Sequence, residues 1–123
     1  MKKLILLFTL LSVVTLAADL SGTWVGKADI TVDGEQQTSM ARVILKQDGN
    51  TVTGTAGRED EGQSDIKNAV VEGETVSFDL KPSEDAPMIH IVLTLEGDAL
   101  NGTVKSAGEG PEVTGKLALK REK

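Results

Sequence analysis

The sequence contains no cysteine and no tyrosine, and it has one tryptophan, two phenylalanines and one histidine. Without cysteine, the chain forms no disulfide and offers no thiol for lipoprotein attachment. A zinc site or a Ser-His-Asp triad has too few members when His90 is the single histidine. We therefore expect a protein that is not an enzyme and has no metal or cofactor.

Basic residues are also scarce, with 13 Lys and Arg against 19 Asp and Glu. Contacts to phosphates need clustered lysines and arginines, so the composition predicts no nucleic-acid binding. With so few aromatic residues, platforms on which bases or sugars stack are also hard to build.

The longest apolar run extends from Leu4 to Leu16, between two lysines and the small residues Ala17 and Ala18. This order is typical of a secretory signal, and the run is shorter than the roughly 20 residues that span a bilayer. We expect a signal-peptide helix in 1–17, cleavage after Ala17, and a single domain in 18–123. That domain keeps 11 basic and 19 acidic residues, a net charge of −8. It is expected to be periplasmic or secreted, with no stable membrane insertion after cleavage.

A repeated unit, a glycine turn followed by an alternating strand, begins at Gly49, Gly73 and Gly97, a spacing of 24 residues. Each unit corresponds to two strands, and no long helix is indicated after the signal. The pattern predicts an all-β monomer, an eight-stranded antiparallel up-and-down β-barrel. The expected strands are 22–32, 37–47, 51–57, 64–71, 75–81, 88–95, 99–105 and 112–121. In the fourth strand the alternation changes phase, which predicts a bulge near Asn68 or Ala69.

The period of two assigns an inward face to each strand. The inward residues are Trp24, Ile30, Val43, Leu45, Val52, Val76, Phe78, Leu80, Ile89, Ile91, Leu93, Leu100, Val104, Val113, Leu117 and Leu119. An eight-stranded barrel is either filled by such side chains or holds one small ligand. If there is a cavity, its expected lining is Ile30, Val43, Val52, Phe78, Leu80, Ile91, Val104 and Leu117. Four inward glycines, at 26, 54, 102 and 115, indicate either strand coiling or room for a ligand.

The first and last strands meet in such a barrel, so Arg121 can lie over the Trp24 ring. Gly22-Thr23-Trp24 opening the first strand, with Arg121 ending the last, resembles the calycin superfamily of lipocalins, fatty-acid-binding proteins and avidins. The resemblance implies a calycin-like barrel that Gly22, Trp24 and Arg121 close at one end, and a small molecule bound inside. A second lipocalin motif and the biotin-contacting aromatic residues of avidins are not found, so it implies no particular ligand.

The loops at the other end of the expected barrel are longer and acidic. Their acids, expected to form the mouth, are Asp33, Glu35, Glu59, Asp60, Glu61, Glu84, Asp85 and Glu109, against one base, Arg58. A mouth of net charge −7 attracts cations and repels anions, so a bound ligand is expected to be neutral or cationic. Some of these acids, with Asp65, also have oxygens suited to calcium, but their spacing matches no EF-hand loop.

Two functions are compatible with these features. In the first, the barrel is an exported binding protein for a small apolar or amphiphilic ligand. In the second, it is a secreted protein-interaction or inhibitor module whose acidic loops meet a basic protein partner. A cavity of about 300 Å³ or more at the acidic end favours the first, and a filled barrel favours the second.

Overall fold

The computed structural model describes residues 19–59, 62–108 and 110–122. Nine strands form in these ranges, and most were expected from the alternation of the sequence. They are β1 (Gly22–Val32), β2 (Glu35–Asp48), β3 (Thr51–Arg58), β4 (Ser64–Asp65), β5 (Lys67–Glu72), β6 (Thr75–Leu80), β7 (Ile89–Glu96), β8 (Ala99–Ser106) and β9 (Val113–Arg121). The expected signal peptide lies outside the described residues. Within them, no helix has the length and apolar character needed to cross a membrane.

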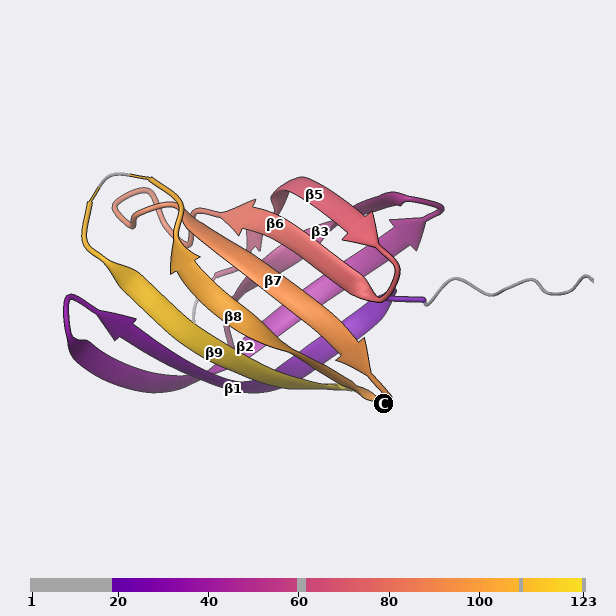
Figure 1. Ribbon diagram of the computed structural model, residues 1–123, viewed down its shortest axis with the longest axis horizontal. Helices are drawn as coiled ribbons and strands as arrows, with labels where there is room; N and C mark the ends of the chain where they lie inside the picture. The colour runs from indigo at the N-terminus through magenta and orange to yellow at the C-terminus, as the bar shows by residue number, and fades with distance from the viewer. Residues whose placement is uncertain (1–18, 60–61, 109, 123) are drawn as a thin grey trace, which may run out of the picture.

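The strands form one antiparallel sheet in the order β4-β3-β2-β1-β9-β8-β7-β6-β5. The first and last long strands are neighbours, and their register places Trp24 opposite Arg121 and Val32 opposite Val113. The sheet curls into a nearly closed barrel (Figure 1), so an all-β antiparallel barrel is confirmed. Closure packs the inward apolar faces of the strands against one another, and no helix among the described residues covers them.

The expectation of eight strands is wrong, because the segment expected as the fourth strand is divided into β4 and β5. Asn68 has a positive φ of 56°, and the β5–β6 register shifts between Lys67 and Val70. This irregularity confirms the expected bulge. The break between the two strands comes earlier, at Ile66: β4 pairs with β3 and β5 pairs with β6, so the two edges of the sheet are consecutive pieces of one stretch. Ile66, the residue between β4 and β5, donates its amide to the Gly54 carbonyl of β3 at 3.0 Å.

The connections at the two ends of the barrel differ. Gly49, Gly73 and Gly97 have φ between +62° and +66° and begin the two-residue turns that join β2 to β3, β5 to β6 and β7 to β8. A positive φ at this position favours glycine, which has no Cβ to clash with the backbone, and this explains the 24-residue repeat. In Figure 1 these turns lie at the right, and the loops after β6 and β8 lie at the left. The β1–β2 connection, Asp33-Gly34, is also a two-residue turn, shorter than expected, because β2 already begins at Glu35.

The core lies inside the barrel and contains the inward faces that the alternation predicts. Fourteen of the sixteen expected inward residues are buried, and Ile30 and Ile89 are half-buried and pack against the same cluster. Leu20, Ala28, Ala41 and Ala56 also belong to this core. The largest fully buried side chains include Trp24, Phe78, Leu93 and Leu100. At the end of the barrel opposite Trp24, several inward positions are alanines.

Candidate ligand-binding cavity

One end of the barrel is closed by Trp24, which is fully buried. Its indole Nε1 donates to the Leu20 carbonyl at 3.0 Å, so the polar atom of the ring is satisfied. The guanidinium carbon of Arg121 lies 4.3 Å from the ring centroid, within cation–π range. Arg121 also donates to the carbonyls of Ser21, at 2.5 Å, and Asp19, at 3.2 Å. The arginine therefore binds the segment before β1 across this end of the barrel.

Gly22 belongs to the same closure for a steric reason. A Cβ at this position would lie 2.8 Å from Nη1 of Arg121, and the backbone φ of +137° is one that side chains rarely adopt. The Gly-x-Trp pattern therefore leaves room for the guanidinium above the ring.

At the opposite end, an apolar cavity of about 340 Å³ is lined by residues of β1, β2, β3, β6, β7, β8 and β9. The 82–87 loop lies over one side of it. The described residues that line it are Ala28, Ile30, Val32, Gln37, Ser39, Ala41, Val43, Ala56, Gly57, Arg58, Leu80, Pro82, Ser83, Ala86, Pro87, Ile89, Ile91, Val104, Val113 and Leu117. Its volume is at the lower end of the range for small-molecule sites.

The cavity exists because small side chains meet on three neighbouring strands. Ala28 of β1 faces Ser39 of β2, and Val43 of β2 faces Ala56 of β3. Ala41 lies between Ser39 and Val43 on the same face of β2. The wall formed by β1, β2 and β3 therefore projects little into the barrel, while β6 to β9 contribute larger aliphatic side chains from the other side.

Six of the eight residues expected to line a cavity do so, namely Ile30, Val43, Leu80, Ile91, Val104 and Leu117. Val52 and Phe78 are buried in the core and are not among the lining residues. Both side chains fill the barrel instead of bordering the open space.

The inward glycines do not create this space. A Cβ at Gly26, Gly54 or Gly102 would collide with the backbone carbonyl of the neighbouring strand, at Ala118, Ile44 and Val92 respectively. At Gly115 it would lie 2.6 Å from the carbonyl oxygen of Asp29. Of the two interpretations that the sequence leaves open, strand coiling is the one these contacts support.

A polar group of lining residues was missed in the sequence. Gln37 and Ser39 come from the cavity face of β2, Arg58 ends β3, and Ser83 lies in the 82–87 loop. The sequence contained a signal for Arg58, because the alternation that points Ala56 inward on β3 also points inward the residue two positions later, Arg58. The same extension predicts Arg121 at the other end.

Of the acids expected at the mouth, the five that the structure describes do not line the cavity. Asp33 accepts from the Glu112 amide through Oδ1 at 3.0 Å, and its own amide donates to the Glu112 carbonyl. Glu35 and Asp85 are exposed, and Glu84 borders a separate outer hollow with Lys67 and Lys81. Three further expected acids, Asp60, Glu61 and Glu109, lie outside the described residues.

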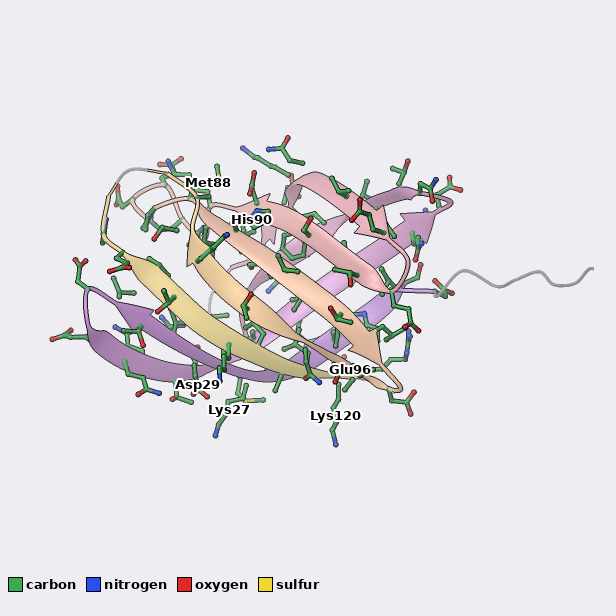
Figure 2. The ribbon with its side chains drawn as sticks, in the orientation of Figure 1. Lys27, Asp29, Met88, His90, Glu96 and Lys120 are labelled. Atoms are coloured by element: carbon green, nitrogen blue, oxygen red, sulfur yellow. The ribbon has the colours of Figure 1, made fainter. Side chains whose placement is uncertain are left out.

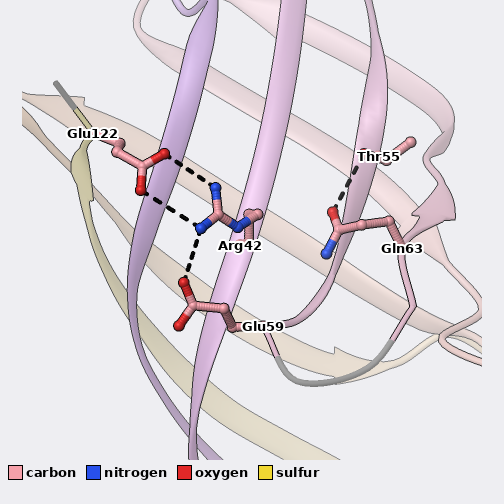
Figure 3. Close-up of polar contacts among 5 residues, drawn as sticks. All are labelled: Arg42, Thr55, Glu59, Gln63 and Glu122. Carbon is pink, nitrogen blue, oxygen red and sulfur yellow. Dashed lines mark hydrogen bonds and ion pairs between the residues drawn. The ribbon is translucent and has the colours of Figure 1, made fainter.

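Glu59 lies on the outer surface of the barrel, where it forms an ion pair with Arg42. The Arg42 guanidinium binds Glu122 at 3.0 Å and Glu59 at 2.9 Å, as Figure 3 shows. The pKa of Arg42 is raised by its hydrogen bonds to Glu122 and then to Glu59. The Arg42 guanidinium thus joins β2 to the residue after β3 and to the residue after β9, and Glu59 is not among the residues that line the cavity.

Other titratable side chains also lie on the outside. Figure 2 shows Lys27, Asp29 and Lys120 projecting away from the barrel wall. The Nδ1 atom of His90 lies 2.7 Å from Asp79 on the neighbouring strand, and hydrogen bonds from His90 and then Asn68 lower the Asp79 pKa. Among the residues described, no group of three or more His, Asp or Glu side chains is placed to hold a metal ion.

Comparisons with known proteins give no family for this chain: no family model matches it, and neither a curated protein nor a solved structure matches it. Functional inference therefore depends on the geometry of the cavity and its rim.

Proposed function

We propose that this protein is an exported, non-enzymatic binding protein whose barrel holds one small apolar or amphiphilic ligand, neutral or cationic. The observation that supports the proposal is the apolar cavity of about 340 Å³ at the end opposite Trp24. Packed protein interiors leave few voids larger than a water molecule. An apolar space of this size, bordered by small side chains on three adjacent strands, is typical of a binding site.

The closure of the barrel by Trp24 and Arg121, at the end opposite the cavity, supports a lipocalin-like, and more broadly calycin-like, architecture. The nearly closed antiparallel barrel is compatible with that fold, and Gly22, Trp24 and Arg121 occupy the places that the resemblance implies. With one end sealed, a ligand enters and leaves at the end with the 82–87 loop. The proposal includes export to the periplasm or the medium as a soluble monomer, based on the signal pattern in residues 1–17.

The alternative is a protein-interaction or inhibitor module that uses the exposed acids near the open end to meet a basic partner. That function needs no internal space, so the cavity favours ligand binding. Native mass spectrometry of protein purified from its own host separates the two. The expected result is a mass increment from a small molecule, and a co-purified basic protein without such an increment supports the alternative.

A cavity-filling substitution tests the site directly. Ala56→Leu adds volume at a buried lining position, and Ala118→Leu adds the same volume at an exposed position on β9. Cyclohexane titrated into the protein should shift the amide resonances of cavity residues such as Ile30 and Val104. We expect Ala56→Leu to weaken this binding at least about tenfold and Ala118→Leu to leave it unchanged. Equal binding by both variants, or none by the wild type, contradicts the proposal.

A further inference from the structure

We infer that this cavity selects its ligand by length, and that the ligand is an aliphatic molecule of no more than about eleven non-hydrogen atoms with its polar end at the rim. Phe78, which does not line the cavity, limits the depth to which such a molecule can enter. The inference rests on the proposed function and narrows it from any small apolar or amphiphilic ligand to a short aliphatic one.

The cavity has a definite inner end, because the core is filled directly below the lining residues. Along β6 the lining stops at Leu80, and the next inward residue, Phe78, is fully buried. Phe78 also lies directly opposite Ile91, a lining residue of β7. The lining stops in the same way on β2, β7 and β9, where the next inward residues, all buried, are Leu45, Leu93 and Leu119. A ligand therefore cannot extend past this layer toward Trp24.

The volume of the cavity limits the size of the molecule that fills it. Liquid water occupies about 30 Å³ per molecule, which is one non-hydrogen atom. A space of about 340 Å³ therefore holds about eleven such atoms. A longer chain must leave its end outside, next to the exposed residues Gln37 and Ser83. Methylene groups that stay in water bury no further apolar surface, so they add no affinity.

The lining favours a saturated body with one polar end. No aromatic residue is among the described residues that line the cavity, so an aromatic ring gains no stacking or edge-to-face contact there. Aliphatic side chains instead contact an aliphatic body through non-directional packing. Gln37, Ser39 and Ser83, polar residues of the lining, are exposed or half-buried. The polar end of the ligand is therefore placed at the rim, and its body points inward.

A series of straight-chain primary alcohols from pentanol to dodecanol tests the length limit. Affinity is measured from the amide resonances of Ile30 and Val104, which line the cavity. We expect affinity for the wild type to rise about fourfold for each added methylene group that is buried. The rise should stop at about ten carbons, which with the hydroxyl oxygen fill the cavity.

Two substitutions should move this limit in opposite directions. Phe78→Ala removes the ring below Leu80, so the affinity should continue to rise up to dodecanol. Ala28→Leu fills part of the cavity from β1, and the rise should stop about three carbons earlier. Because Ala28→Leu removes nothing from the core, it tests the limit even where Phe78→Ala does not fold. Leu100→Ala is the control, since Leu100 lies deeper on β8, with Gly102 between it and Val104.

The outcomes separate the two proposals. Affinity that rises up to dodecanol in the wild type overturns the length limit while leaving a binding cavity in place. A limit that moves in neither Phe78→Ala nor Ala28→Leu, or that moves equally in Leu100→Ala, overturns the assignment of the inner end. Phenylbutanol has as many non-hydrogen atoms as decanol, and tighter binding of phenylbutanol overturns the aliphatic body. If neither the alcohols nor cyclohexane binds the wild type, the proposed function itself fails, and this inference fails with it.

Discussion

Trp24 and Arg121 show how two side chains can fix one end of a barrel. The indole fills the interior between β1 and its neighbours, and the guanidinium covers the ring while binding two backbone carbonyls of the chain before β1. Complete burial of the Trp24 side chain should stabilise the barrel more than the contacts of the half-buried Arg121 do. The two residues are therefore expected to differ in their contribution to the free energy of unfolding.

Trp24→Ala should lower the free energy of unfolding by about 3 to 5 kcal/mol, as other large-to-small core substitutions do. Arg121→Ala should cost less, on the order of 1 to 2 kcal/mol, from the lost cation–π contact and hydrogen bonds. Urea unfolding of both variants measures which one loses more of the free energy of unfolding. Lys120→Ala, at the exposed neighbouring position of β9, is the control. The reverse order, or a solvent-exposed tryptophan emission from the folded wild type, contradicts this account of the closure.

At the scale of the strands, glycines allow the sheet to coil tightly enough to close. Where β8 passes β7, the backbone of Val92 and Leu93 occupies the place that a side chain on Gly102 would need. The φ of this glycine lies outside the left-handed range, so the restriction is steric and not conformational. A close approach of this kind is what a small, strongly curved barrel requires.

Gly102→Ala should destabilise the barrel by about 1 to 3 kcal/mol, the usual cost of overpacking. Gly108→Ala provides the control, because a Cβ there meets no atom within 4 Å and φ is not positive. That substitution should change stability by less than about 0.5 kcal/mol. Thermal unfolding of the two variants tests the difference, and similar melting temperatures would show that the β7–β8 spacing can relax.

For the whole molecule, the described barrel begins close to the expected mature start. Leu20 is fully buried, and its amide donates to Oε1 of Gln47 at 2.8 Å. Cleavage after Ala17 would keep Leu20 and Asp19, whose carbonyls accept from Trp24 and Arg121, in the mature protein. The acidic chain that remains, with a net charge of −8, is suited to solubility.

We predict that the exported protein begins at Ala18 and is recovered in soluble form outside the cytoplasm. N-terminal sequencing and intact mass of protein collected from its host test the prediction. Material that retains Met1 and remains bound to the membrane contradicts it. A barrel that starts at Gly22 should be less stable than one that starts at Ala18, because it lacks Leu20 and the carbonyls that Arg121 binds.

Alternation within each strand was enough to predict most of the fold. A period of two is a local property, since successive side chains of a strand point to opposite faces. It therefore predicts burial of residues such as Val76 and Leu93, and glycine turns predict where strands reverse. The pair of Trp24 and Arg121 follows from the same phases once the barrel is closed.

Tertiary structure decided the rest, because registers join segments that are distant in the sequence. They bring Ala28, Ser39 and Ala56 to one wall and so place the cavity, and they bring Arg58 to its rim while Glu59 turns to Arg42 outside. The break between β4 and β5 also contributes to closure, because β4 pairs with β3 at one edge of the sheet and β5 pairs with β6 at the other. Charge counted along loops predicted an acidic mouth, but the direction of each side chain depends on strand pairing. The sequence by itself therefore determined which residues face inward, and the tertiary structure determined which of them border open space.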